Sequence, residues 1–135
     1  MEQMIHITIP WDALVSDNRR MIPVVQKGKL RMVPSKEYAD AKQRIREIAL
    51  TAVNVSRPRD RISYEPYFPE GEVVVAADFW LPDLRKRDHH NFTKQVLDSL
   101  TGVVYTDDYQ VRRGAWERCG IDRDNPRLEL TIKAI

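Results

Sequence analysis

The alternation of apolar and polar residues along the chain predicts several strands. Strict alternation over Ile5–Ile9, and again over Leu128–Ala134, is typical of strands with one buried face. Val73–Leu81 predicts a further strand whose first five residues are all apolar, as in the centre of a sheet. Val111–Cys119 predicts another, with a bulge near Gly114.

Two stretches have helical periodicity. Apolar residues recur at helical spacing from Lys36 to Asn54, and Ser35 stands where an N-cap belongs. A second helix is predicted from Asn91 to Thr101, with Gly102 as its stop. A helical wheel puts four apolar residues of this helix on one side, Phe92, Val96, Leu97 and Leu100, and four polar residues on the other, Asn91, Lys94, Gln95 and Asp98.

A hairpin is predicted ahead of the first helix, where Val24–Gln26 and Leu30–Val33 flank the turn residues Lys27–Lys29. A polar, proline-bearing loop is predicted from Ser56 to about Glu72. Strands and helices in this order predict an α/β fold (α+β-like), a small mixed sheet packed with two main helices. The 135 residues fit a single domain, 1–135, that can bury a hydrophobic core without disulfides or structural metal ions.

Composition narrows the class of protein. Cys119 is the one cysteine, which excludes an intrachain disulfide. No apolar run approaches the ~20 residues that a membrane span needs. The N-terminal residues Met1–Gln3 lack the basic lead of a signal peptide. We therefore expect a cytoplasmic protein without a membrane partner.

Candidate chemistry follows the strand that ends at Leu81. Asp88 and His90 stand two apart before a helix, where they can converge on a divalent cation. Lys94 follows His90 by one helical turn and can hold a phosphate or stabilise charge that develops on it. Asp107 and Asp108 offer further carboxylates. A metal ion held in this way can activate water for phosphodiester hydrolysis.

The same residues also have purely structural interpretations. Asp88 can simply cap the helix, and both histidines can be solvated. Lys94 and Asp98 can form an ordinary surface ion pair. Asp107 and Asp108 can be part of a turn. The spacing by itself leaves these alternatives open.

Taken together, four segments carry a resemblance: Asp88–Asn91, Lys94, Leu97–Thr101 and Asp107–Val111. They resemble the signature of the RusA family of Holliday-junction resolvases, which is approximately D-x-D-N, a lysine three residues after the asparagine, L/F-D-A-L-T, and later D-D-x-Q-V. The resemblance extends from about Ile5 to the final strand, and its N-terminal part is less specific.

This resemblance implies a homodimeric, Mg²⁺-dependent endonuclease, often encoded by a phage or prophage. Such an enzyme binds four-way DNA junctions in recombination and repair and nicks two opposing strands symmetrically. The resemblance implies that Asp88 and Asp108 belong to the acidic metal site, with Asp107 beside it. Lys94 matches the catalytic lysine of the family, and Asp98 is expected to orient Lys94.

His90 departs from the family pattern, which has aspartate at this position. Imidazole suits transition ions better than it suits Mg²⁺, so His90 as a metal ligand makes Mn²⁺ possible and weakens the affinity for Mg²⁺. Alternatively, His90 supports the metal ligands without binding the ion, or it contacts a phosphate.

The net charge of +2 hides an uneven distribution. From Ser16 to Glu47 the chain has nine cationic and four acidic residues. Basic groups around a metal site favour the approach of phosphates, although a solvated charged face is the alternative. The candidate DNA-binding residues are Arg19, Arg20, Arg85, Lys86, Arg87 and Asn91.

Two questions stay open at this point. Paired nicks need two active centres, so a two-fold dimer is expected, with the edge strands and the early hairpin as candidate surfaces. The alternative function is a non-catalytic, or differently specific, branched-DNA-binding protein of the same fold.

Overall fold

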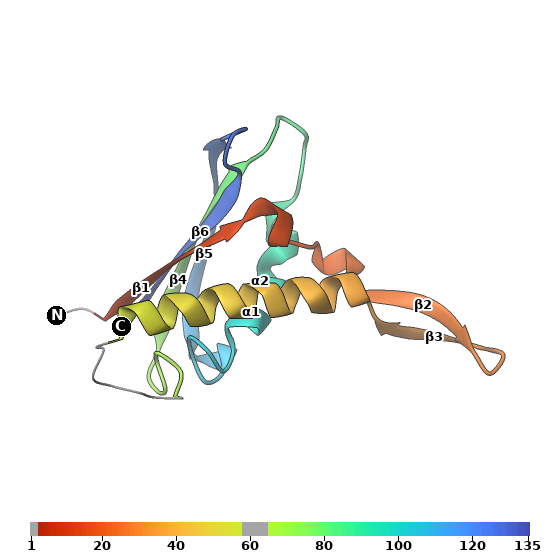
Figure 1. Cartoon of the computed structure of the whole chain (residues 1–135), viewed down its shortest axis with the longest axis horizontal. Helices are drawn as coiled ribbons and strands as arrows, with labels where there is room; N and C mark the ends of the chain where they lie inside the picture. The colour runs from red at the N-terminus through yellow and green to blue at the C-terminus, as the bar shows by residue number, and fades with distance from the viewer. Residues whose placement is uncertain (1–2, 58–64) are drawn as a thin grey trace.

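A four-stranded mixed sheet forms the centre of the computed structural model, which describes residues 3–57 and 65–135 (Figure 1). Its strands are β1 (Met4–Pro10), β6 (Arg127–Ala134), β4 (Val73–Leu81) and β5 (Val111–Ile121), in this order across the sheet. β6 pairs antiparallel with both β1 and β4, whereas β5 pairs parallel with β4. The predicted fold class, a small mixed sheet with two main helices, is therefore confirmed.

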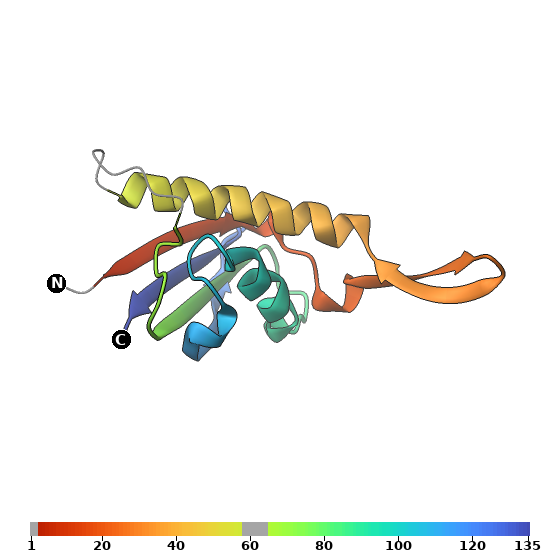
Figure 2. The same cartoon turned by 90° about the horizontal axis from the view of Figure 1, so that it is seen from below.

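Two helices cover one face of this sheet, α1 (Lys36–Ser56) and α2 (Thr93–Leu100) (Figure 2). Ser35 caps α1, as predicted, by accepting a hydrogen bond from the Tyr38 N–H at 2.9 Å. The buried residues of alternate strand positions and of both helices form one continuous core, which includes Ile5, Ile7, Ile9, Ile45, Val53, Val75, Phe79, Val96, Leu100, Leu128, Leu130 and Ile132. The apolar stripe of α1 is thus core, as its spacing predicted.

The connection between the parallel strands β4 and β5 carries most of the candidate residues. It contains the short 3-10 helix η3 (His89–Phe92), then α2, then the 3-10 helix η4 (Asp108–Gln110). Gly102 has φ of +86°, a conformation that suits glycine and ends α2 as predicted. The predicted second helix is present, but its first turn is the separate 3-10 helix η3.

One detail of the sequence interpretation is wrong. Gln95 does not lie on the exposed side of α2, because its side chain is fully buried and takes part in hydrogen bonds. The bulge predicted near Gly114 is present two residues before it, at Arg112, because Val73 and Val74 pair with Val111 and Arg113. The register also shifts opposite Phe79/Trp80. The predicted loop from Ser56 to Glu72 lies partly outside the described residues.

A two-stranded antiparallel ribbon projects from the end of the molecule near the N-terminus of α1 (Figures 1 and 2). It consists of β2 (Met21–Gln26) and β3 (Lys29–Pro34), and we call it the arm. Lys27 and Gly28 join the strands with φ of +51° and +75°, which is typical of a tight type I′ turn. The predicted hairpin is thus confirmed.

The 3-10 helices η1 (Trp11–Ala13) and η2 (Asp17–Arg19) connect β1 to the arm. Within the described residues, no helix has the length and apolar character needed to cross a membrane.

Candidate active site and metal-binding residues

The N-terminus of α2 is capped by a side chain from a distant part of the chain. The backbone N–H groups of Lys94 and Gln95 donate to the two carboxylate oxygens of Asp17, at 3.0 and 2.9 Å. The Tyr38 hydroxyl donates to the same carboxylate at 3.3 Å. Burial of Tyr38, followed by the negative charge of Asp17, raises the pKa of the phenol. Because the first N–H groups of a helix lack partners within the helix, Asp17 stabilises the start of α2 electrostatically.

Gln95 ties the same region together from inside the protein. Its side-chain oxygen accepts a hydrogen bond from the Val15 N–H at 2.8 Å, and its amide nitrogen donates to the Ala13 carbonyl at 3.2 Å. A buried amide costs free energy unless it is hydrogen-bonded, and here both of its ends have partners. The segment from Ala13 to Asp17 is therefore fixed against the first turn of α2.

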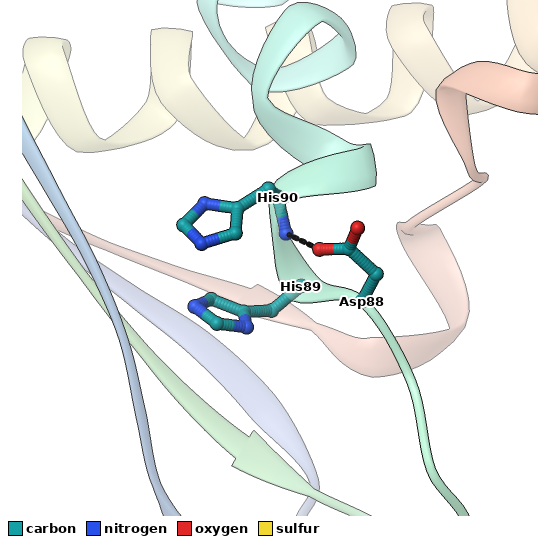
Figure 3. Close-up of side chains that lie close together, drawn as sticks. All are labelled: Asp88, His89 and His90. Carbon is teal, nitrogen blue, oxygen red and sulfur yellow. Dashed lines mark hydrogen bonds between the residues drawn. The ribbon is translucent and has the colours of Figure 1, made fainter.

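Asp88, His89 and His90 lie close together at the start of η3 (Figure 3). Asp88 caps η3, because its Oδ1 accepts the His90 N–H at 3.0 Å. His89 Nε2 lies 3.0 Å from the Trp116 carbonyl oxygen on β5. A carbonyl only accepts, so Nε2 carries the proton and Nδ1 keeps its lone pair in the neutral ring. The two imidazole rings lie on the same side of η3, with centroids 4.2 Å apart.

These three residues form a possible metal-binding group. One ligand atom from each of Asp88, His89 and His90 lies within 4.8 Å of the other two. One carboxylate and two imidazoles fit a divalent transition ion better than Mg²⁺, which prefers oxygen ligands. The hydrogen bond from His89 to the Trp116 carbonyl is the kind of support that orients a metal-binding histidine. The donor set therefore fits a divalent metal ion of the transition series.

Lys94 lies one turn beyond His90, with a half-exposed side chain. Its Nζ is 3.2 Å from Asp98 Oδ2, an i, i+4 pair on α2. The Asp98 side chain is more buried than that of Lys94, at 25% against 48% exposed. Asp98 thus holds the ammonium group near the surface, where an anionic ligand can reach it.

Asp107 and Asp108 lie beyond the other end of α2. Asp107 caps η4 in a capping box with Gln110, accepting the Tyr109 N–H at 2.9 Å. Desolvation, followed by the hydrogen bond and repulsion from Asp107, raises the pKa of the Asp108 carboxyl. Repulsion from Asp98 acts in the same direction, whereas Lys94 opposes it. Asp108 therefore lies in the field of both charged groups of the Lys94–Asp98 pair.

The candidate ligands fall into two groups. Asp88, His89 and His90 make up the η3 group, and neither Asp107 nor Asp108 joins it within the 4.8 Å limit. We call the carboxylates of Asp98, Asp107 and Asp108 the acidic group, because Asp107 and Asp98 both contribute to the raised pKa of Asp108. Convergence of Asp88 and Asp108 on one ion stays a prediction. A third set, Asp78, Glu117 and Cys119, also has ligand atoms within 4.8 Å of one another, but Asp78 faces away from the helices.

The basic residues before Asp88 differ in how far they are engaged. Arg87 forms two hydrogen bonds to the Asp83 carboxylate, at 2.7 and 3.0 Å, and lies over the Trp11 ring at 5.4 Å. Those hydrogen bonds lower the pKa of Asp83 to about 2. Arg85 and Lys86 are exposed and lie in the same loop, between Asp83 and Arg87. Arg87 therefore supports the loop, while its neighbours face solvent.

A shallow surface pocket next to the η3 group is lined by Lys86, Arg87, Asp88, His89 and Arg118. Three of these five residues are cationic, so the pocket is suited to a phosphate. Elsewhere, Arg19 pairs with Glu37 at 3.4 Å, and Arg20 is exposed at the base of the arm. Asn91 is half-buried in η3.

Sequence reasoning missed four residues of this region. Asp17 and Gln95 act over long sequence separations, so no local pattern marks them. The sequence offers no role for His89 beyond a solvated side chain as one alternative, whereas its ring lies beside that of His90. Arg118 lines the pocket from β5, and only its cationic character within a strand could have marked it.

Comparison with known families identifies the class. The family described as Endodeoxyribonuclease RusA matches residues 10–133, nearly the whole chain. The chain belongs to this family of endodeoxyribonucleases, and membership implies an endonuclease of the Holliday-junction resolvase type. Among curated proteins, no sequence matches the chain.

Proposed function

We propose that this protein is a metal-dependent endonuclease that cuts four-way DNA junctions by paired, symmetric nicks. The observation that carries the proposal is the η3 group, in which Asp88, His89 and His90 offer ligand atoms within 4.8 Å of one another, one turn from Lys94. This group lies in the part of the chain that matches a family of endodeoxyribonucleases. Metal ligands next to a partly exposed lysine suit phosphodiester hydrolysis.

Asp88 and His90 would hold the ion, with His89 as a third ligand, and Asp108 and Asp107 would supply further carboxylates. When bound, the ion would polarise the scissile phosphate and activate water. The nitrogen-rich η3 group favours Mn²⁺, whereas binding of Mg²⁺ depends on the carboxylates of the acidic group. The raised pKa of Asp108 is consistent with this role, because a carboxylate that is desolvated and repelled by its neighbours is stabilised by a nearby cation.

Lys94 would contact a non-bridging oxygen of the scissile phosphate and stabilise the charge that develops on it. Asp98 is a positioning residue in this proposal. The 3.2 Å ion pair holds the ammonium group of Lys94 beside Asp98, one turn further along α2. Asp17 helps to position Lys94 by accepting a hydrogen bond from the Lys94 backbone N–H group.

DNA would approach across the exposed basic loop. Arg85 and Lys86 are available for phosphates, and the pocket that Lys86 shares with Arg118 lies beside Asp88. Arg87 would act by holding the loop, given its pairing with Asp83. Arg19, Arg20 and Asn91 remain further candidates for DNA contact. Two opposing nicks require two such centres, which supports a homodimer.

The test is cleavage of a synthetic four-way junction with Mg²⁺ and Mn²⁺ side by side. Asp88→Asn and Asp108→Asn should abolish nicking, and Lys94→Ala should lower its rate by about 10²-fold or more. Junction binding should stay largely intact in all three variants. Asp40→Asn, an exposed carboxylate on α1, is the matched control. Full cleavage by all three site variants would refute the mechanism.

The alternative is a branched-DNA-binding protein of the same fold that does not cut. It is favoured by one observation, namely that Asp88 and Asp107 both cap 3-10 helices and Lys94 is paired. In that case the wild-type protein binds junctions in a salt-sensitive manner but nicks nothing with either ion. Comparing a junction with flap and linear DNA under one salt condition tests a third possibility, a nuclease of different specificity.

A further inference from the structure

The arm is a ribbon whose two strands are paired with each other rather than with the main sheet. β2 and β3 pair over their full lengths, and in the described part of the chain no other helix or strand packs extensively on either of them. Figures 1 and 2 both show the arm extending away from the sheet and helices. An isolated two-stranded ribbon is marginally stable in water, so its exposed surface calls for a partner.

One face of the arm is wholly apolar. The register pairs Val25 with Leu30 and Pro23 with Met32, and side chains alternate between faces along each strand. One face therefore consists of Met21, Pro23, Val25, Leu30, Met32 and Pro34. Val25 and Leu30 are each 73% exposed, next to the tip. Nothing else in the described residues leaves such a continuous apolar strip open to solvent.

The charge of the arm is of a single sign. Lys27 stands in the turn, Lys29 and Arg31 lie on the face opposite the apolar strip, and residues 21–34 contain no acidic side chain. The arm itself therefore offers no carboxylate to pair these three cations. Nucleic acid instead supplies phosphates for these cations, and a branch point adds the apolar faces of base pairs that are not stacked on a neighbour.

We propose that the arm enters the branch point of a DNA junction, with its apolar face against exposed base pairs and its cations on the flanking phosphates. This inference rests on the proposed function, since it concerns the same DNA substrate. Aliphatic side chains are the type that proteins insert at base steps. The arm would supply preference for branched over linear DNA without reading any base sequence.

The arm is also mechanically linked to the candidate active site. Its base is closed by the Ser35 N–H donating to the Arg20 carbonyl at 2.8 Å. Four residues before the arm, Asp17 caps α2 at Lys94 and Gln95. DNA that is held by the arm is therefore held at a fixed position relative to Lys94.

The experiment measures binding in EDTA, where no cleavage occurs, to a four-way junction and to a linear duplex of equal length. The Val25→Thr/Leu30→Thr variant keeps the charge and the strand propensity of the arm. It should lose about 10-fold or more in junction affinity and less than about 2-fold in duplex affinity. Val55→Thr, equally conservative at an 80% exposed position on α1, should change neither.

A second variant tests the cations. Lys27→Gln/Lys29→Gln should weaken binding to both DNAs and lower the slope of log affinity against log salt by about 2. A 2-aminopurine base at the branch point should brighten on binding of the wild type, as it unstacks, and stay dim with the threonine variant.

Three results would overturn the inference while sparing the proposed function. The first is an unchanged junction affinity of the Val25→Thr/Leu30→Thr variant, and the second is an equal loss of affinity for duplex and junction. The third is a change of this variant from dimer to monomer in sedimentation, which would make the apolar face an interface between copies. A wild-type protein that binds no junction would overturn both proposals.

Discussion

The β1–β6 ribbon and the arm each have one apolar face, but the burial of that face is opposite in the two. This face follows from alternation in β1, in β6 and over Lys29–Met32 of β3. Leu128, Leu130 and Ile132 of β6 are fully buried, because α1 and α2 cover that face of the sheet. Val25 and Leu30 of the arm are each 73% exposed. Alternation thus predicts a strand with one apolar face, but it does not tell what covers that face. In one ribbon the cover is the protein itself, and in the other we infer that it is DNA.

The sharpest test of this contrast replaces one leucine in each ribbon. Leu130→Ala opens a cavity in the core and should lower the free energy of unfolding by about 2–5 kcal/mol. Leu30→Ala should change it by less than about 0.5 kcal/mol, since its side chain is mostly in water already. Urea unfolding followed by circular dichroism measures both. If Leu30→Ala costs as much as Leu130→Ala, the arm is covered in the free protein and the contrast fails.

The next test concerns Asp17, which links the segment before the arm to the start of α2. Asp17→Ala removes the acceptor for the Lys94 and Gln95 N–H groups and should destabilise the protein by about 1–2 kcal/mol. Asp17→Asn keeps one side-chain oxygen and should cost less. Thermal unfolding compares the two variants. Equal stability of Asp17→Ala and the wild type would mean that the arm is not anchored through this residue.

Much of the fold could be predicted from the sequence, because its signals are local. The period of two over Ile5–Ile9 and the period of 3.6 over α1 each follow from burial on one face. Gln95 shows the limit of this reasoning. A polar residue on a helical wheel is assigned to solvent, yet here Val15 and Ala13 supply its partners from a segment that is distant in sequence.

The candidate site could be predicted only in part for the same reason. The spacing put Lys94 one turn beyond His90, and the resemblance to the RusA family implied that Asp88 and Asp108 share an acidic metal site. The sequence could not show that His89 turns toward His90, since that depends on the Trp116 carbonyl of β5. Nor could it show that, among the described residues, His89 joins Asp88 and His90 in one group of ligand atoms within 4.8 Å.

The smallest expected effect concerns the acidic group. The pKa of Asp108 is raised above its usual 3.8, so the folded protein binds the proton more tightly than the unfolded chain. Stability therefore falls as the pH rises from about 3.8 through the native pKa, and the penalty persists at neutral pH. Asp108→Asn should remove this penalty and stabilise the protein at pH 7 by up to about 0.5 kcal/mol, because the group is exposed and screened.

Below the usual pKa both states of the wild type are protonated, so the advantage of Asp108→Asn should vanish near pH 3. Thermal unfolding from pH 3 to pH 8 measures the difference, with Asp40→Asn as an exposed control on α1. The same substitution should abolish junction cleavage, and a variant that is more stable but inactive is the signature of a carboxylate kept for function rather than for folding. If Asp108→Asn destabilises the protein at pH 7, Asp108 contributes to the fold around η4, and its carboxylate is not kept for function alone.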